Sequence, residues 1–594
     1  MYGLSNIFIL MKHLKRFVCA LSLLILTNAQ PQTASAIDTR AEPEAASRHQ
    51  LPVPKTTTAR QHMIVTANPH ASRAGRDMLR LGGSAIDAAI AAQLVLNLVE
   101  PQSSGIGGGG FLLHWDQQQH RLSSFDGRET APHSARPDRF MKNGQPMKFR
   151  QAVPGGLSVG TPGLLKMLEQ AHKKQGRLPW GQLFQPALQL ARKGFAVSPR
   201  LNALLHKADP KKFGARARAY FFNPQEKPWP VGHILKNPAF AHSLENIARH
   251  GADFFHDGPL AAKITTAVQT SKRNKGDMTR TDLATYRAIE RPPVCTSYRG
   301  FHICGMGLPS SGMLTIAQIL KMLEPFNLGK IALNPKAMHL SAEASKLAYA
   351  DRNRYMADPD FTPDARPLLD PRYLAKRSLL ISPAKSMGKA QPGQPPFKIT
   401  PPGKDATIEN NGTTHISIID QWGNAVSLTS SIEAAFGSHL MIGGFLLNNE
   451  LTDFSFRPTD KQGHPIANRV EPDKRPRSSM SPTMVFDPKG RLIMVTGSPG
   501  GSRIILYVLK TIIGHIDWHM NAAALVQMPN WGSRNGPLEL EKKIGVEYIA
   551  QKMRAFGHKI RITPMTSGVH LIIRNGTILV GAADPRREGL PLGD

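Results

Sequence analysis

The stretch that decides this sequence is NNGTTHIS, residues 410–417. It ends a proline-rich segment with little periodicity and begins an alternating run, THISII, that predicts a strand over 414–419. Three interpretations are open. In the first, Gly-Thr-Thr is a loop that enters a strand. In the second, Asn411-Gly412-Thr413 is an N-x-T glycosylation acceptor. In the third, the Gly412–Thr413 bond is cut and Thr413 becomes a chain terminus.

A threonine at a chain terminus carries its own catalytic base. The free α-amine has an ordinary pKa of about 7.7–8.0, so near neutral pH a useful fraction is unprotonated and accepts the hydroxyl proton. A glycine before the threonine permits the tight backbone conformation in which the hydroxyl attacks the preceding carbonyl. Because Gly-Thr-Thr is a common tripeptide, the cleavage interpretation depends on further catalytic groups.

Two acidic residues follow in FLLNNELTDFS, at Glu450 and Asp453. Acids at this spacing could bind an ammonium group from two sides. The alternative is a solvated loop, but the apolar FLL and Phe454 flank both acids. This setting favours a binding site.

Hydroxyl and backbone donors come next in the chain. RPRSSMSP contributes Ser478 and Ser479, and GSPGG contributes Gly500 and Gly501. A Pro-Gly-Gly turn ahead of a helix exposes backbone N–H groups, which suit an oxyanion hole. The second half of the chain therefore offers a nucleophile, an ammonium-binding pair and an oxyanion-binding turn.

The N-terminus has the pattern of an export signal, residues 1–36. A basic cluster (Lys12, Lys15 and Arg16) precedes an apolar run over 17–27, and Ala34-Ser35-Ala36 matches a cleavage site. Translation starts at Met1 or Met11. The apolar run is too short to span about 30 Å of hydrocarbon, so we expect an exported, periplasmic or secreted protein without a stable membrane anchor.

The chain is strongly basic, with 74 Lys and Arg against 43 Asp and Glu among 594 residues. Such an excess of positive charge could bind nucleic acid, an anionic membrane or an acidic substrate. The basic residues are spread along the chain, and no zinc-finger or RNA-binding signature accompanies them. We therefore expect no nucleic-acid partner.

Two cysteines, Cys295 and Cys304, remain beyond the signal. They lie symmetrically about Arg299-Gly300 in CTSYRGFHIC, where a two-residue turn would place them opposite each other in a hairpin. That geometry allows a disulfide, and an exported protein could keep one. Two free thiols are the alternative.

The pattern of elements indicates helices followed by short strands. A buried helix is predicted over 84–100, with a capping-box-like start at Ser84 and Asp87. In SSGIGGGGF (103–111), no Gly-Lys-Ser/Thr follows the glycines, so backbone crowding explains them better than a phosphate site. Helical patterns dominate from about 160 to 380, and short strands alternate with a helix or two after 413.

These segments together resemble the γ-glutamyltransferase (glutathione hydrolase) family of N-terminal-nucleophile hydrolases. The similar segments in the second half are TTHISIIDQWGNAV, LLNNELTDFS, KRPRSSMSPT and TGSPGGSR. In the first half they include GGSAIDAAIAAQ, SSGIGGGGF, FDGRETAP, LPSSG and AYADRNRYMADPDF. The resemblance covers about residues 60–590.

The resemblance implies an α+β fold, the four-layer αββα sandwich, and an exported precursor that cuts itself at Gly412–Thr413. Residues 37–412 would form the large subunit and 413–594 the small subunit of a processed heterodimer. The substrates would be glutathione or related γ-glutamyl compounds, with water, amino acids or peptides as acceptors. The resemblance implies no cofactor, and the histidines show no metal-ligand spacing such as H-E-x-x-H.

Roles for individual residues follow from the matched positions. The catalytic group would comprise the nucleophile Thr413, Thr414, the hydroxyl of Ser431 and the oxyanion-hole glycines Gly500 and Gly501. The substrate-binding residues would form two sets. The α-carboxylate would be held by Arg128, Ser478 and Ser479. The α-ammonium would be held by Glu433, Glu450 and Asp453.

Two departures from the family pattern stand out. Glu433 occupies a position where well-studied members have Asn, which places three acids near one ammonium. The segment between Asp453 and Lys474 contains no Tyr or Trp, whereas some bacterial members have an aromatic lid residue there.

Two other functions stay open. One is an acylase of cephalosporin or glutaryl side chains within the same fold, although three acids around an ammonium argue against substrates that lack it. The other is a non-catalytic basic protein that binds the cell envelope.

Overall fold

The computed structural model describes residues 53–396, 402–405, 412–543 and 545–594, which all belong to one unit, Asp38–Asp594. The predicted signal (1–36) and Asn411 of the possible glycosylation acceptor lie outside the described residues. Among the described helices, none has the length and apolar character needed to cross a bilayer.

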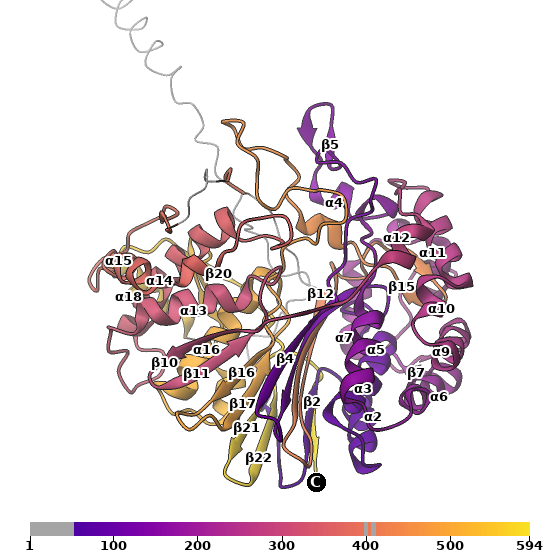
Figure 1. Cartoon of the computed structure of the whole chain (residues 1–594), viewed down its shortest axis with the longest axis horizontal. Coiled ribbons are helices and arrows are strands. Elements are labelled where there is room, and N and C mark those ends of the chain that lie inside the picture. Colours follow the sequence, from indigo (N-terminus) through magenta and orange to yellow (C-terminus); the bar gives the residue numbers. More distant parts are fainter. Residues whose placement is uncertain (1–52, 397–401, 406–411, 544) are drawn as a thin grey trace, which may run out of the picture. The chain divides into compact units, whose positions relative to one another are not determined.

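Two antiparallel sheets of seven strands each form the centre of the fold (Figure 1). Sheet A has the order β1 (Lys55–Ala59), β22 (Ile578–Ala583), β21 (His570–Asn575), β17 (Leu492–Gly497), β16 (Thr483–Phe486), β11 (Phe301–Gly305) and β10 (Val294–Tyr298). Sheet B has the order β23 (Leu590–Gly593), β2 (Met63–Thr66), β12 (Gly412–Ile419), β13 (Ala425–Glu433), β3 (Gly109–Asp116), β4 (Arg121–Asp126) and β9 (Ile289–Arg291).

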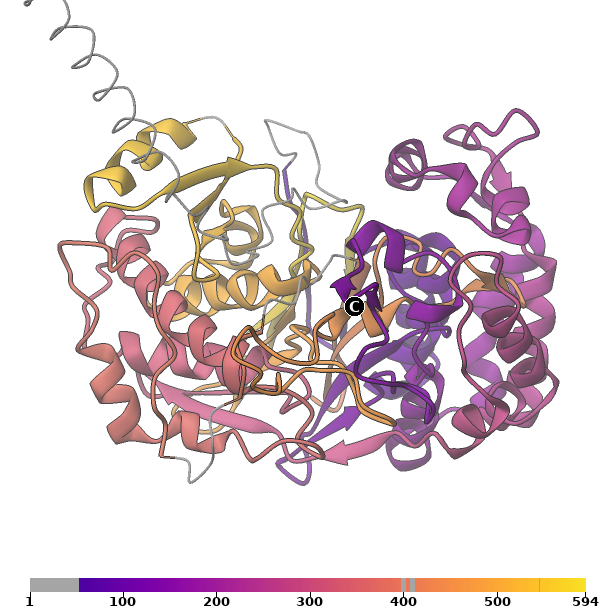
Figure 2. The same cartoon turned by 90° about the horizontal axis from the view of Figure 1, so that it is seen from above.

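The inner faces of the two sheets pack on each other, and helices cover both outer faces (Figures 1 and 2). Val65 and Leu113 of sheet B share one apolar cluster with Val495 and Ile572 of sheet A.

Sheet B packs on one group of helices that includes α2 (Pro69–Arg80), α3 (Ala85–Val99), α5 (Leu164–Gln175), α6 (Gln185–Lys193) and α9 (Pro238–His250). Sheet A packs on α13 (Gly312–Leu323), α14 (Pro335–Tyr355), α16 (Ile504–Ile516), α17 (Ala522–Gln527) and α18 (Val546–Ala555). The predicted αββα sandwich is confirmed.

Strands from before and after Gly412 alternate in both sheets. In sheet B, the neighbouring strands β12 and β13 lie between β2 and β3. In sheet A, β22, β21, β17 and β16 lie between β1 and β11. Neither part of the chain builds a complete sheet by itself.

The glycine-rich stretch after α3 is crowded, as the sequence predicted. A Cβ on Gly108 would collide with the carbonyl oxygen of Ser431, and one on Gly109 would meet the Glu129 carboxylate. Only hydrogen fits at these positions. The start of β3 therefore lies directly against β13 and the residues after β4.

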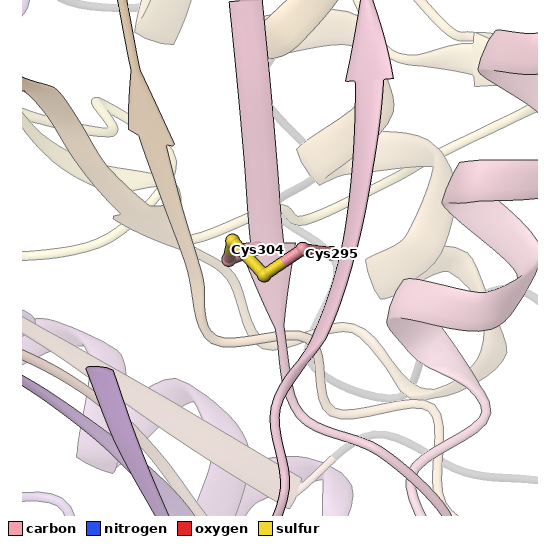
Figure 3. Close-up of a disulfide and its surroundings, with 2 residues drawn as sticks. All are labelled: Cys295 and Cys304. Carbon is pink, nitrogen blue, oxygen red and sulfur yellow. A yellow bond between two sulfur atoms is a disulfide. The ribbon is translucent and has the colours of Figure 1, made fainter. Parts of the chain in front are cut away.

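The predicted hairpin of CTSYRGFHIC forms β10 and β11. Cys295 pairs with Cys304 in the strand register, and the two are joined by a disulfide (Figure 3). Arg299 and Gly300 both have positive φ, 51° and 84°, as a tight two-residue turn requires. The disulfide interpretation is confirmed over the alternative of two free thiols.

Candidate active site

The bond between Gly412 and Thr413 lies at the start of the buried strand β12, beside the end of β13. Thr413 pairs with Ser431, and the register shifts between Gly412 and Thr413 themselves. The Thr413 hydroxyl donates to Ser431 Oγ at 3.4 Å, and the Ser431 hydroxyl donates to the Gly412 carbonyl at 2.9 Å. A chain of hydroxyls therefore leads from Thr413 to the carbonyl immediately before it.

An asparagine fixes the short helix that carries Glu450 and Asp453, η5 (Glu450–Asp453). The Asn448 amide oxygen accepts from the backbone N–H groups of Gly160 and Glu450, both at 2.9 Å. Its amide nitrogen donates to the carbonyls of Gly107 and Gly160, both at 2.8 Å. These four bonds hold η5 against the glycine-rich stretch.

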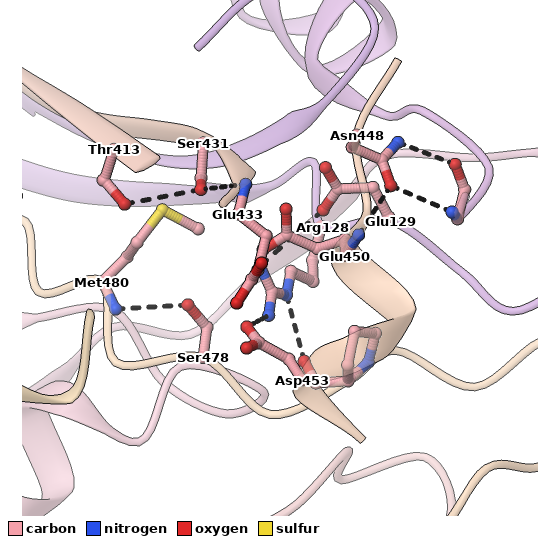
Figure 4. Close-up of polar contacts among 12 residues, drawn as sticks. Arg128, Glu129, Thr413, Ser431, Glu433, Asn448, Glu450, Asp453, Ser478 and Met480 are labelled. Atoms are coloured by element: carbon pink, nitrogen blue, oxygen red, sulfur yellow. Dashed lines mark hydrogen bonds and ion pairs between the residues drawn. The ribbon is translucent and has the colours of Figure 1, made fainter. Parts of the chain in front are cut away.

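Arg128 extends from the chain after β4 to meet both acids (Figure 4). Its guanidinium donates to Asp453 Oδ2 at 2.6 Å and to Glu450 Oε1. It also donates to the carbonyls of Pro476 and Arg477, each at 3.0 Å. The side chain is fully buried, so all of its charge is balanced within the protein.

The charges around Arg128 shift the pKa values of this group. Burial lowers the pKa of Arg128, but the carboxylates of Glu450, Asp453 and Glu129 outweigh it and raise the pKa above its ordinary value. Burial raises the pKa of Glu450, although Arg128 opposes the shift. Burial and the neighbouring Glu450 raise the pKa of Glu129 well above its ordinary range. Glu129 is therefore the acid of this group most inclined to hold a proton.

Glu433 ends β13 beside the hydroxyl chain. Its backbone N–H donates to Ser431 Oγ at 2.8 Å, and its carboxylate accepts from the Asn449 amide. Its φ of 74° is in the left-handed region, which is rare for a residue with a side chain. This conformation turns the chain after β13 and accompanies the placement of Glu433 in the cavity wall.

The two serines lie on a segment that runs beside residues 308–312. Ser478 donates its N–H to the Pro309 carbonyl at 2.9 Å, and Ser311 Oγ donates to the Ser478 carbonyl at 2.7 Å. Ser479 Oγ accepts from Arg352 Nη2 at 2.6 Å. These bonds therefore fix the segment against residues 308–312 and against α14.

One cavity brings most of the predicted site residues together. Its walls are Arg128, Thr413, Ser431, Glu433, Glu450, Asp453, Ser478, Ser479, Met480, Gly501 and Ile504. Gly500 directly precedes Gly501, with φ values of 137° and 55°, at the turn before α16. The Thr413 hydroxyl, a guanidinium, three carboxylates and a glycine turn thus lie around one cavity.

Comparison with known proteins agrees with this geometry. The family model of gamma-glutamyltranspeptidase matches residues 71–593. This chain belongs to the gamma-glutamyltranspeptidase family. The protein named "Glutathione hydrolase proenzyme" of Bacillus subtilis (strain 168) is 37% identical over 549 residues, which covers 89% of this chain and 91% of that protein. The protein of the same name in Escherichia coli (strain K12) is also 37% identical, over 544 residues, with the same coverage.

The fold is shared with acylases as well as with gamma-glutamyltranspeptidases. The crystal structure of cephalosporin acylase from Bacillus halodurans superposes with a TM-score of 0.80 at 26% identity, covering 92% of this chain and 99% of that one. The fold therefore does not by itself separate a transpeptidase from an acylase, and the residues of the cavity must do so.

Thr414 is the predicted site residue that the structure places on the other face of β12. Its hydroxyl donates to Glu100 Oε2 at 3.1 Å, at the end of α3, and it is absent from the cavity wall. Successive strand residues point to opposite faces, so Thr413 and Thr414 cannot share one cavity. Thr414 contacts the helix layer instead.

Sequence reasoning missed Glu129, Met480, Ile504 and the Asn448 amide. Glu129 and Met480 adjoin predicted residues, Arg128 and Ser479, but nothing in their spacing marks them. Asn448 could have been suspected, since a polar residue between FLL and two acids needs partners when it is buried.

A second polar cluster lies apart from this cavity, between α14 and the chain after α18. His339, Glu343 and His558 bring their ligand atoms within 4.8 Å of one another. The Lys346 ammonium already donates to Glu343 Oε1 at 2.6 Å, and the two histidines contact each other at 2.8 Å between Nδ1 and Nε2. Because a metal ion here would meet that fixed positive charge, the cluster fits a hydrogen-bonded packing contact better than a metal site.

Proposed function

We propose that this protein is a self-processed γ-glutamyl hydrolase and transferase. It would cleave the γ-glutamyl amide of glutathione and related compounds through an ester on Thr413. The observation that carries the proposal is the position of Thr413 in one cavity with Arg128, Glu450 and Asp453. Family membership supports the same activity.

The proposed acyl transfer begins at the Thr413 hydroxyl. Its oxygen attacks the γ-carbonyl carbon, and the free α-amine of Thr413 takes the hydroxyl proton. Backbone N–H groups at Gly500 and Gly501 would stabilise the oxyanion. The C–N bond then breaks and the leaving amine takes the proton, which leaves the γ-glutamyl group as an ester on Thr413. Water, or the amine of an amino acid or peptide, attacks the ester carbonyl and gives a proton to the α-amine. The bond to Thr413 Oγ breaks, and that oxygen takes the proton back.

Recognition of the donor follows from the charges in the cavity. Arg128 now pairs with Glu450 and Asp453. The α-carbon of a γ-glutamyl group carries both a carboxylate and an ammonium. The carboxylate would bind Arg128 and the two serines, and the ammonium would bind the acids, so the zwitterion would replace the ion pairs within the cavity by ion pairs to the substrate.

The alternative of a cephalosporin or glutaryl acylase is supported by the shared fold. Such substrates can lack the α-ammonium. Binding them would leave Glu433, Glu450 and Asp453 buried around an empty position, which costs free energy. The acids therefore favour a γ-glutamyl donor.

A denaturing gel of the purified protein tests self-processing. We expect two bands, with Thr413 at the N-terminus of the smaller one, and a single uncut band for Thr413→Ala. Thr413→Ser keeps a hydroxyl and serves as the matched control, which should still be cut. If the wild-type chain stays uncut under conditions where it is folded, the mechanism is wrong.

Turnover of glutathione and of its analogue without the glutamyl α-amine separates the two enzyme functions. We expect kcat/KM to be at least about a hundredfold higher for glutathione, because the analogue leaves charged groups unpaired. Equal values for the two substrates would favour the acylase.

A further inference from the structure

A buried ion pair lies just ahead of the proposed cut. Asp405 precedes Gly412 by seven positions, and its Oδ2 lies 2.9 Å from Arg477 Nη2. The two side chains are only 1% and 2% exposed. Removing one partner of such a pair leaves an uncompensated buried charge, so each side chain restrains the other strongly.

The backbone around Asp405 is held as well. Gly403 forms a parallel bridge with Ile466, and its N–H donates to the Pro465 carbonyl at 2.8 Å. The next N–H, of Lys404, donates to Asp460 Oδ2 at 3.2 Å. A Cβ at Gly403 would collide with the carbonyl of His464, so the two segments approach closely. Residues 402–405 therefore lie along the loop 458–466, which belongs to the part of the chain after the cut.

Arg477 connects this segment to the cavity. Its carbonyl accepts from Arg128 Nη2 at 3.0 Å, while its own N–H donates to Asn468 Oδ1 at 3.0 Å. The Asn468 amide in turn donates to the Asp453 carbonyl at 2.8 Å. One residue thus binds Asp405 through its side chain and the cavity guanidinium through its backbone.

We propose that Asp405 and Arg477 are positioning residues for the γ-glutamyl donor. Their ion pair fixes the Arg477 carbonyl, and that carbonyl orients Arg128 toward the α-carboxylate of the donor. The inference rests on the proposed function, because it takes Arg128 as the donor-binding arginine.

After the cut, the same pair joins the two subunits next to the cavity. Asp405 would belong to the large subunit and Arg477 to the small one. Seven extended residues span at most about 25 Å, so the pair also limits how far the new C-terminus at Gly412 withdraws. The end of the large subunit would therefore stay within that distance of Asp405.

Steady-state kinetics of three variants test the pair. For Asp405→Asn and Arg477→Met, measured on fully cut protein, we expect KM for glutathione to rise about tenfold with kcat within about twofold. Exchanging the charges, with Asp405→Arg and Arg477→Asp together, should recover part of the loss.

The matched control is Asp517→Asn. Asp517 pairs with Arg299 at 3.3 Å, and this pair also joins residues on opposite sides of the cut, but neither lines the cavity. It should leave KM unchanged. The Asp517→Asn variant is expected to have a lower melting temperature and an unchanged KM. If Asp405→Asn behaves in the same way, the positioning role is wrong.

Amide hydrogen exchange at Gly403 provides a readout that does not depend on activity. Exchange should be slow in the cut wild-type protein and clearly faster in Asp405→Asn. Equal exchange in both would overturn the anchoring of this segment, even if the protein had no γ-glutamyl activity. Absence of wild-type turnover, with the exchange difference intact, would contradict only the proposed function and the kinetic role.

Discussion

The Ser431 hydroxyl donates a hydrogen bond of 2.9 Å to the carbonyl oxygen of Gly412. This carbonyl carbon is the one that the Thr413 hydroxyl would attack. In the uncut chain the nitrogen of Thr413 is an amide and has no free electron pair to act as a base. Polarisation of the Gly412 carbonyl by Ser431 is therefore the activation that the described geometry offers for the first cut.

Ser431→Ala should slow self-cleavage by roughly three- to tenfold, the effect of one neutral hydrogen bond on a reaction barrier. A time course of the uncut chain on denaturing gels measures the rate. Ser431→Thr keeps the hydroxyl and should be cut at nearly the wild-type rate. Equal rates for the alanine and threonine variants would exclude this role for Ser431.

Arg128→Lys should raise KM for glutathione roughly tenfold to hundredfold. Lysine keeps the charge but cannot donate in parallel to a carboxylate while also binding the carbonyls of Pro476 and Arg477. Steady-state kinetics measure the change. Arg139→Lys is the matched control, because Arg139 pairs with Asp277 away from the cavity. A similar KM for both variants would refute donor binding by Arg128.

The pH dependence of KM tests Glu450. Burial raises its pKa, so Glu450 takes up a proton at a higher pH than an ordinary carboxylate. Since only the ionised form attracts an ammonium, KM should rise as the pH falls through that raised value. In the Glu450→Gln variant, KM should be high at every pH and should not rise further as the pH falls. An unchanged pH profile in the variant would assign the titration to another group.

Removing the disulfide should cost about 2–3 kcal/mol of stability, the entropy of a short closed loop in the unfolded chain. Replacing Cys295 and Cys304 by serine should lower the melting temperature by a few degrees. KM and kcat should stay unchanged, because neither cysteine lines the cavity. Reductant should lower the melting temperature of the wild-type protein and leave that of the variant unaffected.

Local patterns were sufficient to predict much of the fold around the Gly412–Thr413 bond. The alternation of THISII and AVSLTSSI predicts two strands, and the turn at 420–424 pairs them as β12 and β13. The apolar flanks of Glu450 and Asp453 correctly predict their burial. These features depend on neighbours in the chain, which is why the sequence alone could indicate them.

Other features depend on contacts between distant segments. Arg128 lies 322 residues before Glu450 in the chain, and no spacing rule connects them. Only the resemblance to a family pointed to Arg128. Asp405 could not have been found by either route, since it is one charge in a proline-rich segment. Its partner Arg477 becomes apparent only when the two segments are seen side by side.

The alternation of strands in both sheets has a consequence for the life of the cut protein. Before the cut, refolding would be a step within one molecule, with a rate that does not depend on protein concentration. After a cut at Gly412–Thr413, every refolding event would need two separate molecules to meet and interleave their strands. Processing would thus turn a fold that forms within one chain into one that persists mainly because it unfolds slowly.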